Sequence, residues 1–492
     1  MMAHDTKALD RNYILRTDAA RHLYEGPLSD GPGLRYMDVL DAHTHFDGTK
    51  RDLPDNAWDL LVGPDHYKKQ LMWQAGMRRE QIDGQALPAQ EKFRRFAAES
   101  YRNIGKIGHD GMRLALARHF DWNEPLAPSN ADHVWDRVAA YVATRKVTLG
   151  SIFDGGPDGK KTGKIKALCT CDNPWLTDGE FELFEQPVDG ISWNPIRHGL
   201  RVEHIGNPVR FASIGGSNDP MKGLDSVLGR EIKSVDDYRE AFEMAVRRFA
   251  DHGNTSFDFS MRGGPYCHLD DIQKVSDKRM NEILDKARRI SETRVQEPVL
   301  PDDEMHALAY MLPWLTDLAY KAGIPIMYKI GVEREANPYA PEGAHDMVDD
   351  RVGLSGILPL LQKYEELSTR DGSNMDWAVL LSSRHPFDYT QMADLASRFR
   401  NVYVAGDWWN NDHPDGMRAG LEQRIPWAGF DKTYVFFTDV RSPFDFTRMD
   451  IKKRVVANHL GNLVHGRGLT MTEAERVARN AFIDMPKRLF KL

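Results

Sequence analysis

Two histidines separated by a single residue, His43 and His45, are the first side chains whose type and spacing suggest chemistry. They end an apolar run, residues 36–45 (YMDVLDAHTH), that predicts a strand. In an extended segment, side chains two residues apart point to the same face. Both imidazoles can therefore bind one divalent ion through neutral nitrogens. A bare His-x-His also occurs as two surface histidines in a turn, so the pattern needs a partner.

A carboxylate near the far end of the chain, Asp439, could be that partner. It lies at the end of the last apolar run, residues 434–440 (YVFFTDV); taken alone, it could equally be a helix cap or a loop acid. Together with His43 and His45 it predicts a His₂-carboxylate set with open coordination positions, as catalysis requires. We expect Asp439 to be a metal ligand, a proton acceptor, or both. The donor set favours one divalent ion, with Zn²⁺ first and Mn²⁺, Fe²⁺ or Co²⁺ feasible.

The segments that must position these groups are short apolar runs that alternate with amphipathic helices. Each run is almost continuously apolar, which is typical of strands in a parallel sheet covered on both faces. Eight such runs predict an α/β fold of the (β/α)₈ barrel type, although a doubly wound open sheet would use the same elements. The helical segments include residues 234–253 and 302–323, which both end in Gly, a common helix stop. The predicted strands are residues 36–45, 165–171, 208–216, 254–260, 325–331, 377–383, 402–407 and 434–440.

Two regions interrupt this alternation. Residues 50–150, between the first two predicted strands, have a mainly helical pattern and are too long for a strand-to-helix loop. We predict that they form a helical insertion, a lid over the barrel mouth. Residues 172–205 are rich in Pro, Gly and Trp and predict a long active-site loop. The whole chain, residues 1–492, is then a single barrel with one insertion.

Composition limits the possible partners. The 492 residues carry a formal net charge of −8, which gives no electrostatic footprint for nucleic acid or an anionic membrane. No apolar run approaches the ~20 residues of a membrane-spanning helix, and the first residues lack the apolar stretch of a secretory signal. Three cysteines are too few for a disulfide framework, and we expect Cys169 and Cys171 to be ordinary strand residues. These features predict a cytoplasmic homo-oligomer that binds a small molecule, without nucleic acid or a membrane.

Several sequence blocks resemble, in the same order, those of the uronate isomerase family, the glucuronate/galacturonate isomerases of the amidohydrolase superfamily. The resemblance spans most of the chain, and its DHYK, WWxND and TDxRS motifs are more specific than His-x-His. It implies an amidohydrolase-type barrel and an aldose–ketose isomerase that interconverts a hexuronate and its ketose by metal-assisted proton transfer. The blocks are HTHFD (43–47), LLVGPDHYKKQLMWQAG (60–76), GMRLALARHF (111–120), HVWD (133–136), LCTCDNP (168–174), GDWWNND (406–412) and FTDVRSPF (437–444).

The implied reaction assigns roles to residues in these blocks. It needs a base for the acidic proton next to the carbonyl and a group that returns the proton to the neighbouring carbon. It also needs positive charge on the enediolate oxygen and a clamp for the carboxylate. The resemblance places His66 and Tyr67 by the substrate as catalytic groups, and Arg441 as the clamp of a carboxylate or oxyanion. It makes Trp408 and Trp409 the walls of the sugar site, although simple packing at the barrel mouth would also explain them.

Two further positions follow the family pattern and are expected to contact the substrate. Asp258 ends the fourth predicted strand, where the family carries Asp in a Ser-Asp-His-Gly motif, and the following His is Phe259 here. A surface loop acid is the alternative for Asp258. Arg334 falls where the family also has Arg.

Three positions depart from the family pattern. Lys329, in Tyr-Lys-Ile-Gly, replaces a His close to the metal in the family motif Gln-Leu-His-Ile-Gly. It could be a neutral catalytic base with a pKa lowered by burial beside a cation, a charged anion binder, or a lysine that reaches solvent or pairs with Asp258. On the third strand the family has Arg-Pro-Asp near the substrate, whereas residues 214–219 contain no Arg. After the sixth strand, His385 brings a new polar group to the mouth.

Two other functions remain open on this scaffold. One is a metal-dependent hydrolase or decarboxylase that acts on a different small carboxylated substrate, with Asp439 as proton shuttle. The other is a non-catalytic sugar-binding relative. Tyr67, Arg441 and the tryptophan pair favour the isomerase because they suit a sugar acid. The strand-five and strand-six histidines of ordinary amidohydrolases are not in place, which disfavours hydrolysis.

Overall fold

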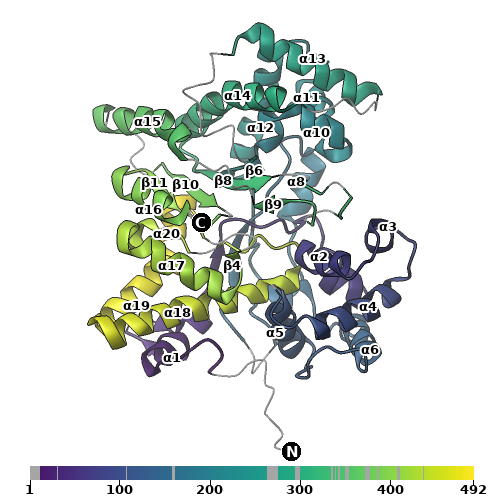
Figure 1. Cartoon of the computed structure of the whole chain (residues 1–492), viewed down its shortest axis with the longest axis vertical. Helices are drawn as coiled ribbons and strands as arrows, with labels where there is room; N and C mark the ends of the chain where they lie inside the picture. The colour runs from purple at the N-terminus through teal and green to yellow at the C-terminus, as the bar shows by residue number, and fades with distance from the viewer. Residues whose placement is uncertain are drawn as a thin grey trace, which may run out of the picture.

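Parallel strands at the centre of the molecule form the core of its barrel (Figure 1). The structure is a computed structural model that describes residues 12–492 except 30, 107, 158–160, 263–274, 294–299, 334, 335, 338, 342, 343, 349–353, 372–376, 384, 387, 407–410 and 436. The strands of the barrel are β3 (Val39–Asp41), β4 (Ile165–Cys169), β5 (Ile196–Arg197), β6 (Gly199–Arg201), β7 (Ser256–Arg262), β8 (Ile326–Glu333), β10 (Val379–Ser383) and β11 (Val402–Val404). They pair in parallel in the orders β3-β4-β5 and β6-β7-β8-β10-β11.

Hydrogen bonds join these two sheets into a closed ring. β5 and β6 flank His198 as one interrupted strand, and a parallel bridge from Asp172 to Leu200 links the β4 side to β6. On the other side, with β5 and β6 counted as one strand, residues 433–435 and 437–440 form the eighth segment. Tyr434 N donates to Val404 O (2.8 Å), and His45 N donates to Val440 O (2.9 Å). The first and last segments are therefore neighbours, as a (β/α)₈ barrel requires.

The third strand differs from the prediction. Residues 208–216 form helix α10 (Pro208–Ile214) rather than a strand, because Pro208 occupies the first helical turn, where its fixed φ favours a helix. The third strand is residues 196–201 instead, inside the predicted loop 172–205. That loop also contains α8 (Asp178–Glu185), which begins at a Thr177–Glu180 capping box.

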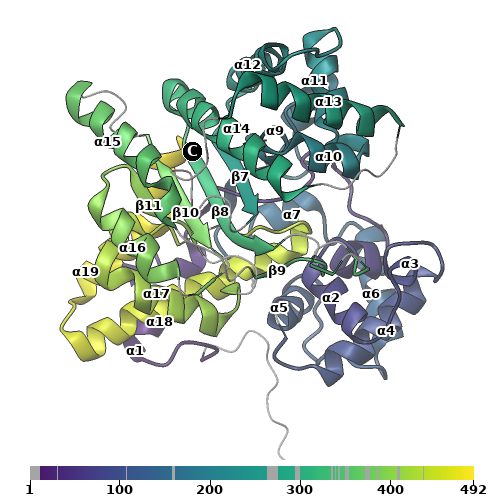
Figure 2. The ribbon, with the colours of Figure 1, turned by 45° about the horizontal axis from the view of Figure 1, so that its top comes forward.

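The segment between β3 and β4 is mainly helical. Figures 1 and 2 show α2 to α6 gathered on one side of the molecule. Its buried Phe93 belongs to the same apolar cluster as Val39 of β3 and Phe437 of the eighth segment, so the insertion shares the core of the barrel. The insertion contains a π-helix (Trp58–Val62), α2 (His66–Gln74), α3 (Arg79–Ile82), α4 (Ala89–Arg102), α5 (His109–His119), α6 (Ala131–Ala143) and α7 (Leu149–Phe153).

The remaining helices cover the barrel. The predicted segments 234–253 and 302–323 correspond to α12 and α14, and α14 ends at Gly323 with a left-handed φ of 62°. No helix among the described residues has the length and apolar character to cross a bilayer. The helices are α1 (Asp18–Glu25), α9 (Glu203–Gly206), α11 (Pro220–Leu228), α12 (Val235–Asp251), α13 (Asp277–Thr293), α14 (Pro301–Ala322), α15 (Leu358–Asp371), α16 (Asp388–Arg398), α17 (Pro414–Ala428), α18 (Arg448–Arg467), α19 (Met471–Arg479) and α20 (Met485–Phe490). The short strands β1 (Pro27–Leu28), β2 (Gly31–Pro32) and β9 (Met347–Val348) pair antiparallel, β9 with β8.

Candidate active site

The two imidazoles and the distant carboxylate converge at the junction of the first and eighth segments. His43 Nε2 lies 2.8 Å from Asp439 Oδ1, and His45 Nε2 lies 3.4 Å from the same oxygen. His43 and Asp439 are 2% and 3% exposed. Asp439 has a left-handed φ of 53°, unusual for a residue other than Gly, and its N–H is held by His43 O (3.1 Å). The strained backbone turns this carboxylate toward the imidazoles.

Lys329 of β8 lies against the same groups. Its ammonium contacts His43 Nε2 and lies 3.4 Å from Asp439 Oδ1 and 3.3 Å from Asp258 Oδ1. Burial would lower the pKa of Lys329, but the charges of Asp258 and Asp439 outweigh it and raise the pKa. The lysine is 1% exposed, so the interpretation that it reaches solvent is wrong and its pairing with Asp258 is confirmed. The raised pKa favours a charged Lys329 over a neutral base.

Both carboxylates of the cluster are ionised. Burial would raise the pKa of Asp439, but the Lys329 charge and the adjoining imidazoles of His43 and His45 hold it well below its ordinary value. Burial opposes ionisation of Asp258 as well, yet Lys329 and the two imidazoles lower the pKa of Asp258 to about 2. Asp258 is 4% exposed, so it is not a surface loop acid.

Sequence reasoning missed one member of this cluster, Cys171. Its Sγ donates to Asp258 Oδ2 (3.2 Å), just beyond the end of β4, rather than packing as an ordinary strand residue. Burial and the Asp258 charge raise the pKa of the Cys171 thiol well above its usual value, so it remains a thiol. The Cys-Thr-Cys sequence at a strand end was the available signal.

His66 and Tyr67 lie at the start of α2 beside the cluster. The N-cap residue Asp65 accepts hydrogen bonds from Tyr67 N (2.8 Å) and Lys68 N, which fixes this helix start. Burial and the Arg441 charge lower the pKa of His66 to about 3, and burial raises that of Tyr67 well above its ordinary value. Both side chains are therefore neutral near pH 7.

Arg441 contributes positive charge beside His45 and His66. Burial, with a smaller contribution from the Arg441 charge, lowers the pKa of His45 to about 4, and the Arg441 charge also lowers that of His66. Arg441 is half-buried, two residues after Asp439. A guanidinium in this position can meet an anion that enters the mouth.

A buried ionic network, which sequence reasoning also missed, holds the DHY motif in place. Arg448, the first residue of α18, pairs with Asp65 (2.6 Å) and Asp412 (3.4 Å), and its guanidinium stacks over the Tyr67 ring at 4.8 Å. Lys452 pairs with Asp412 at 2.9 Å. The ion pair of Arg448 with Asp65 ties the start of α18 to the start of α2.

The third strand carries an arginine after all. Arg201 ends β6, and its guanidinium pairs with Glu203. Its charge acts on Cys171 and Asp258, which places it beside the cluster. The expectation of a third strand without Arg was wrong because the strand is residues 196–201 and not 208–216.

Four predicted substrate contacts are not joined to the cluster by this geometry. Trp408, Trp409 and Arg334 lie outside the described residues. His385 follows β10, where its N–H donates to Ser383 Oγ (3.0 Å) and its charge acts on Asp388 at the start of α16.

The donor atoms of His43, His45 and Asp439 fit a metal ion. The nitrogens of His43 and His45 lie 2.8 Å and 3.4 Å from the Asp439 oxygen, separations that ligands about 2.0–2.2 Å from a shared zinc ion can have. His43, Cys171 and Asp258 form a second set, whose donor atoms lie within 4.8 Å of one another. Lys329 contacts the nitrogen of His43 that faces Asp439.

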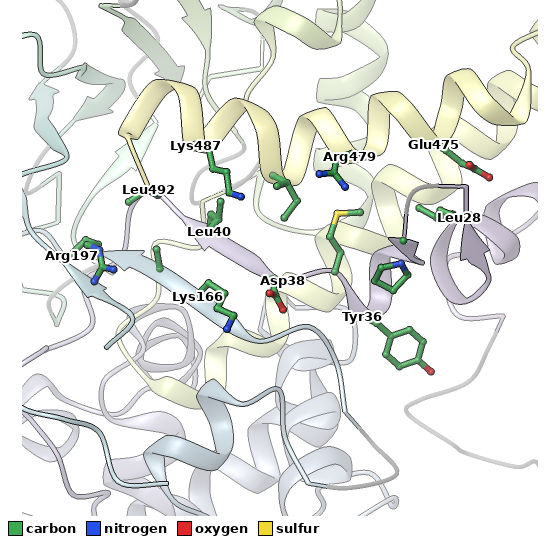
Figure 3. A pocket seen from close by; sticks show the side chains of 15 residues that line it. Leu28, Tyr36, Asp38, Leu40, Lys166, Arg197, Glu475, Arg479, Lys487 and Leu492 are labelled. Atoms are coloured by element: carbon green, nitrogen blue, oxygen red, sulfur yellow. The ribbon is translucent and has the colours of Figure 1, made fainter. Parts of the chain in front are cut away.

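A separate pocket of about 520 Å³ lies on the outer side of the barrel. Figure 3 shows Leu40 of β3 and Lys166 of β4 facing Arg479 of α19 and Lys487 of α20 across it. Along β3 the side chains alternate between the two faces. Leu40 therefore points away from the barrel interior that holds Asp41 and His43, and the pocket is distinct from the cluster.

Comparisons with known proteins agree along the whole chain. A family model described as glucuronate isomerase matches residues 6–485. The uronate isomerase of Thermotoga maritima is 22% identical over 98% of this chain and 99% of its own length. The crystal structure of a Thermotoga maritima uronate isomerase superimposes with a TM-score of 0.81 at 20% identity, covering 98% of this chain and 99% of that one. That of glucuronate isomerase from Caulobacter crescentus gives 0.79 at 20% identity, covering 98% and 97%.

Proposed function

The chain belongs to the glucuronate isomerase family, and we propose that its barrel mouth interconverts a hexuronate and its ketose with the residues assembled there. The observation that carries this conclusion is the family match over residues 6–485, which includes every residue of the cluster. The enzyme is an aldose–ketose isomerase. The roles of individual residues below are our proposals.

Asp439 is the proposed proton acceptor. Its lowered pKa keeps it ionised near pH 7, but it also makes Asp439 a weak base. A weak base removes a carbon-bound proton only if the developing enediolate is strongly stabilised. That requirement supports a role for the cations that surround the carboxylate.

Lys329 and Arg441 are the proposed anion stabilisers. The Lys329 ammonium lies 3.4 Å from Asp439 Oδ1 and can donate to a substrate oxygen bound there. Arg441, whose charge acts on His45 and His66, is the proposed clamp for the sugar carboxylate because its planar fork matches a carboxylate. Arg201 adds a third positive charge near Asp258.

His66 and Tyr67 are proposed as neutral partners of the substrate. A neutral imidazole can accept or donate a hydrogen bond, and a protonated phenol can donate one. Either group can return the proton to the neighbouring carbon. Asp258, His385, Arg334, Trp408 and Trp409 are retained as proposed substrate contacts, and the helical insertion (50–150) as the proposed lid of a single-domain barrel.

We propose one divalent ion, most simply Zn²⁺, at His43, His45 and Asp439. When bound, such an ion would polarise a substrate oxygen and stabilise negative charge on it. The proposal also includes a cytoplasmic location, supported by the low cysteine content, and a homo-oligomeric state.

Proton exchange in heavy water tests the function. The purified protein is incubated with D-glucuronate or D-galacturonate in D₂O and followed by NMR. We expect ketose signals together with deuterium at the carbon next to the carbonyl. Irreversible cleavage or release of CO₂ would point to a hydrolase or decarboxylase, and binding without exchange to a sugar-binding protein without catalysis.

A further inference from the structure

The Lys329 ammonium lies inside the donor set that would hold a metal ion. It contacts His43 Nε2 and lies 3.4 Å from Asp439 Oδ1, which are two of the three donor atoms of that set. The same ammonium lies 3.3 Å from Asp258 Oδ1 on the other side. Lys329 thus bridges the proposed metal ligands and the carboxylate of β7.

The nitrogen of His43 can serve only one cation at a time. A neutral imidazole has one nitrogen with a lone pair, and that lone pair accepts either a hydrogen bond or a metal ion. When Lys329 donates to Nε2, the 2.8 Å approach of Nε2 to Asp439 Oδ1 brings two acceptors together. Such a pair is favourable only with a cation beside both atoms, and here the ammonium is that cation.

The surroundings make this arrangement stable without an ion. Burying a single ammonium is costly unless carboxylates and hydrogen bonds compensate it. Lys329, at 1% exposed, has two carboxylates within 3.4 Å, and both are buried as well. Neutral Cys171 donates to Asp258 Oδ2 (3.2 Å), the carboxylate oxygen other than the one nearest Lys329.

We propose that the Lys329 ammonium and a divalent ion are alternative occupants of the place between His43 and Asp439. This inference rests on the metal site proposed above. In the metal-free protein Lys329 occupies the site. Binding of an ion requires Lys329 to leave His43 Nε2 and withdraw toward Asp258. Lys329 therefore sets the metal affinity, and it keeps the site assembled when the ion is absent.

Zinc titration of two lysine variants tests the competition. Metal-free wild type, Lys329→Met and the control Lys452→Met are titrated with Zn²⁺ against a chelator of known affinity. Methionine keeps the unbranched shape of lysine without its charge. Lys452 is the matched control because its Nζ lies 5.8 Å from the Phe437 ring centre, Lys329 Nζ lies 5.7 Å from it, and the partner of Lys452 is Asp412.

We expect Lys329→Met to bind Zn²⁺ at least tenfold more tightly than wild type, and Lys452→Met to differ from wild type less than threefold. Without metal, Lys329→Met should also unfold at a lower temperature than wild type, and Zn²⁺ should raise its Tm more. Equal or weaker zinc binding by Lys329→Met would overturn the competition while leaving the metal site intact. Failure of both wild type and Lys329→Met to bind Zn²⁺ would overturn the metal site and the competition together.

Crystal structures of wild type provide a test that needs no variant. In metal-free crystals we expect Lys329 Nζ in contact with His43 Nε2, and in zinc-soaked crystals we expect Nζ withdrawn from it toward Asp258. Zinc on His43 with Nζ unmoved would overturn the proposal.

Discussion

The buried site alternates in charge from Asp258 through Lys329 to Asp439, with His43 between them. At this scale the sequence predicted well what residue types reveal. A His-x-His pair and a strand-end Asp have few common uses together, and the structure brings them within bonding distance. The sequence could not predict the charge of Lys329, because that charge depends on two carboxylates that lie 71 and 110 residues away along the chain.

Replacing both histidines tests the donor set. The variant His43→Ala/His45→Ala should lose stoichiometric zinc because two of three ligands are removed. Metal content is measured by elemental analysis after exhaustive dialysis. Retention of a full equivalent would show that the ion binds elsewhere, for instance at Cys171 and Asp258.

Arg441→Met tests the carboxylate clamp. Loss of a charge-assisted, bidentate contact should lower kcat/KM for the uronate about 30-fold or more. Binding of the neutral hexose of the same configuration should change less than about threefold. Similar losses for both ligands would indicate that Arg441 has a structural role.

His66 predicts a pH dependence of stability. Its pKa is about 3 in the folded protein and 6.5 in the unfolded chain, so the unfolded state binds more protons between these values. Its contribution to the free energy of unfolding is therefore complete above pH 6.5 and is lost as the pH falls. Between pH 7 and pH 5 the loss is about 2 kcal/mol. Urea unfolding of His66→Gln should lack this part of the wild-type decrease, and an unchanged decrease would contradict the assignment.

Among the elements, strands with a continuous apolar sequence were predicted well, because the helices next to them in the chain cover and bury them. The third strand was not, because its residues 196–201 are short, polar in part and interrupted at His198. The apolar run 208–216 was a better candidate by pattern, yet Pro208 begins a helix there. The ionic network between α2 and α18 could not be predicted from the sequence either, because Asp65 and Arg448 are 383 residues apart.

Variants of two arginines of α18, Arg448 and Arg454, test whether the ionic network positions Tyr67 or only stabilises the fold. Arg448→Met removes the nearest cation of Asp65 and one of the two cations of Asp412, and Arg454→Met removes the nearest cation of Asp450. Each change should cost about 3–5 kcal/mol of unfolding free energy. Only Arg448 contacts the start of α2 and the Tyr67 ring, so kcat should fall at least tenfold more in Arg448→Met, assayed where both variants are folded. Equal kcat values for the two variants would contradict a role of this network in positioning the site.

For the whole molecule, the alternation of strands and helices predicted the (β/α)₈ class, and the barrel closes between its first and last segments. Besides the site itself, Thr438 N donates to Asp41 Oδ1 across this junction (3.1 Å). The closure could be predicted because eight parallel segments leave two ends that must pair. The outer pocket beside α19 and α20 had no sequence signal, since it arises from how helices pack on the barrel.

An ion at this junction should stabilise the entire fold. It would bind the folded barrel and not the separated segments, so zinc at 100 times its Kd should add about 2.7 kcal/mol to the unfolding free energy. Thermal unfolding with zinc and with a chelator measures the difference. His43→Ala/His45→Ala should show no zinc-dependent rise in Tm, and a rise equal to that of wild type would contradict a site at the closure.

Because His43 and Asp439 are adjacent in the fold but distant in sequence, the proposed active site can form only late in synthesis of the chain. The two residues are 396 positions apart, and ribosomes add about 5–20 residues per second. On the order of 20–80 s therefore pass between the appearance of the imidazoles and that of the carboxylate. Until Asp439 has been synthesised, the β3 edge of the forming sheet lacks its last partner, and the proposed site cannot turn over substrate.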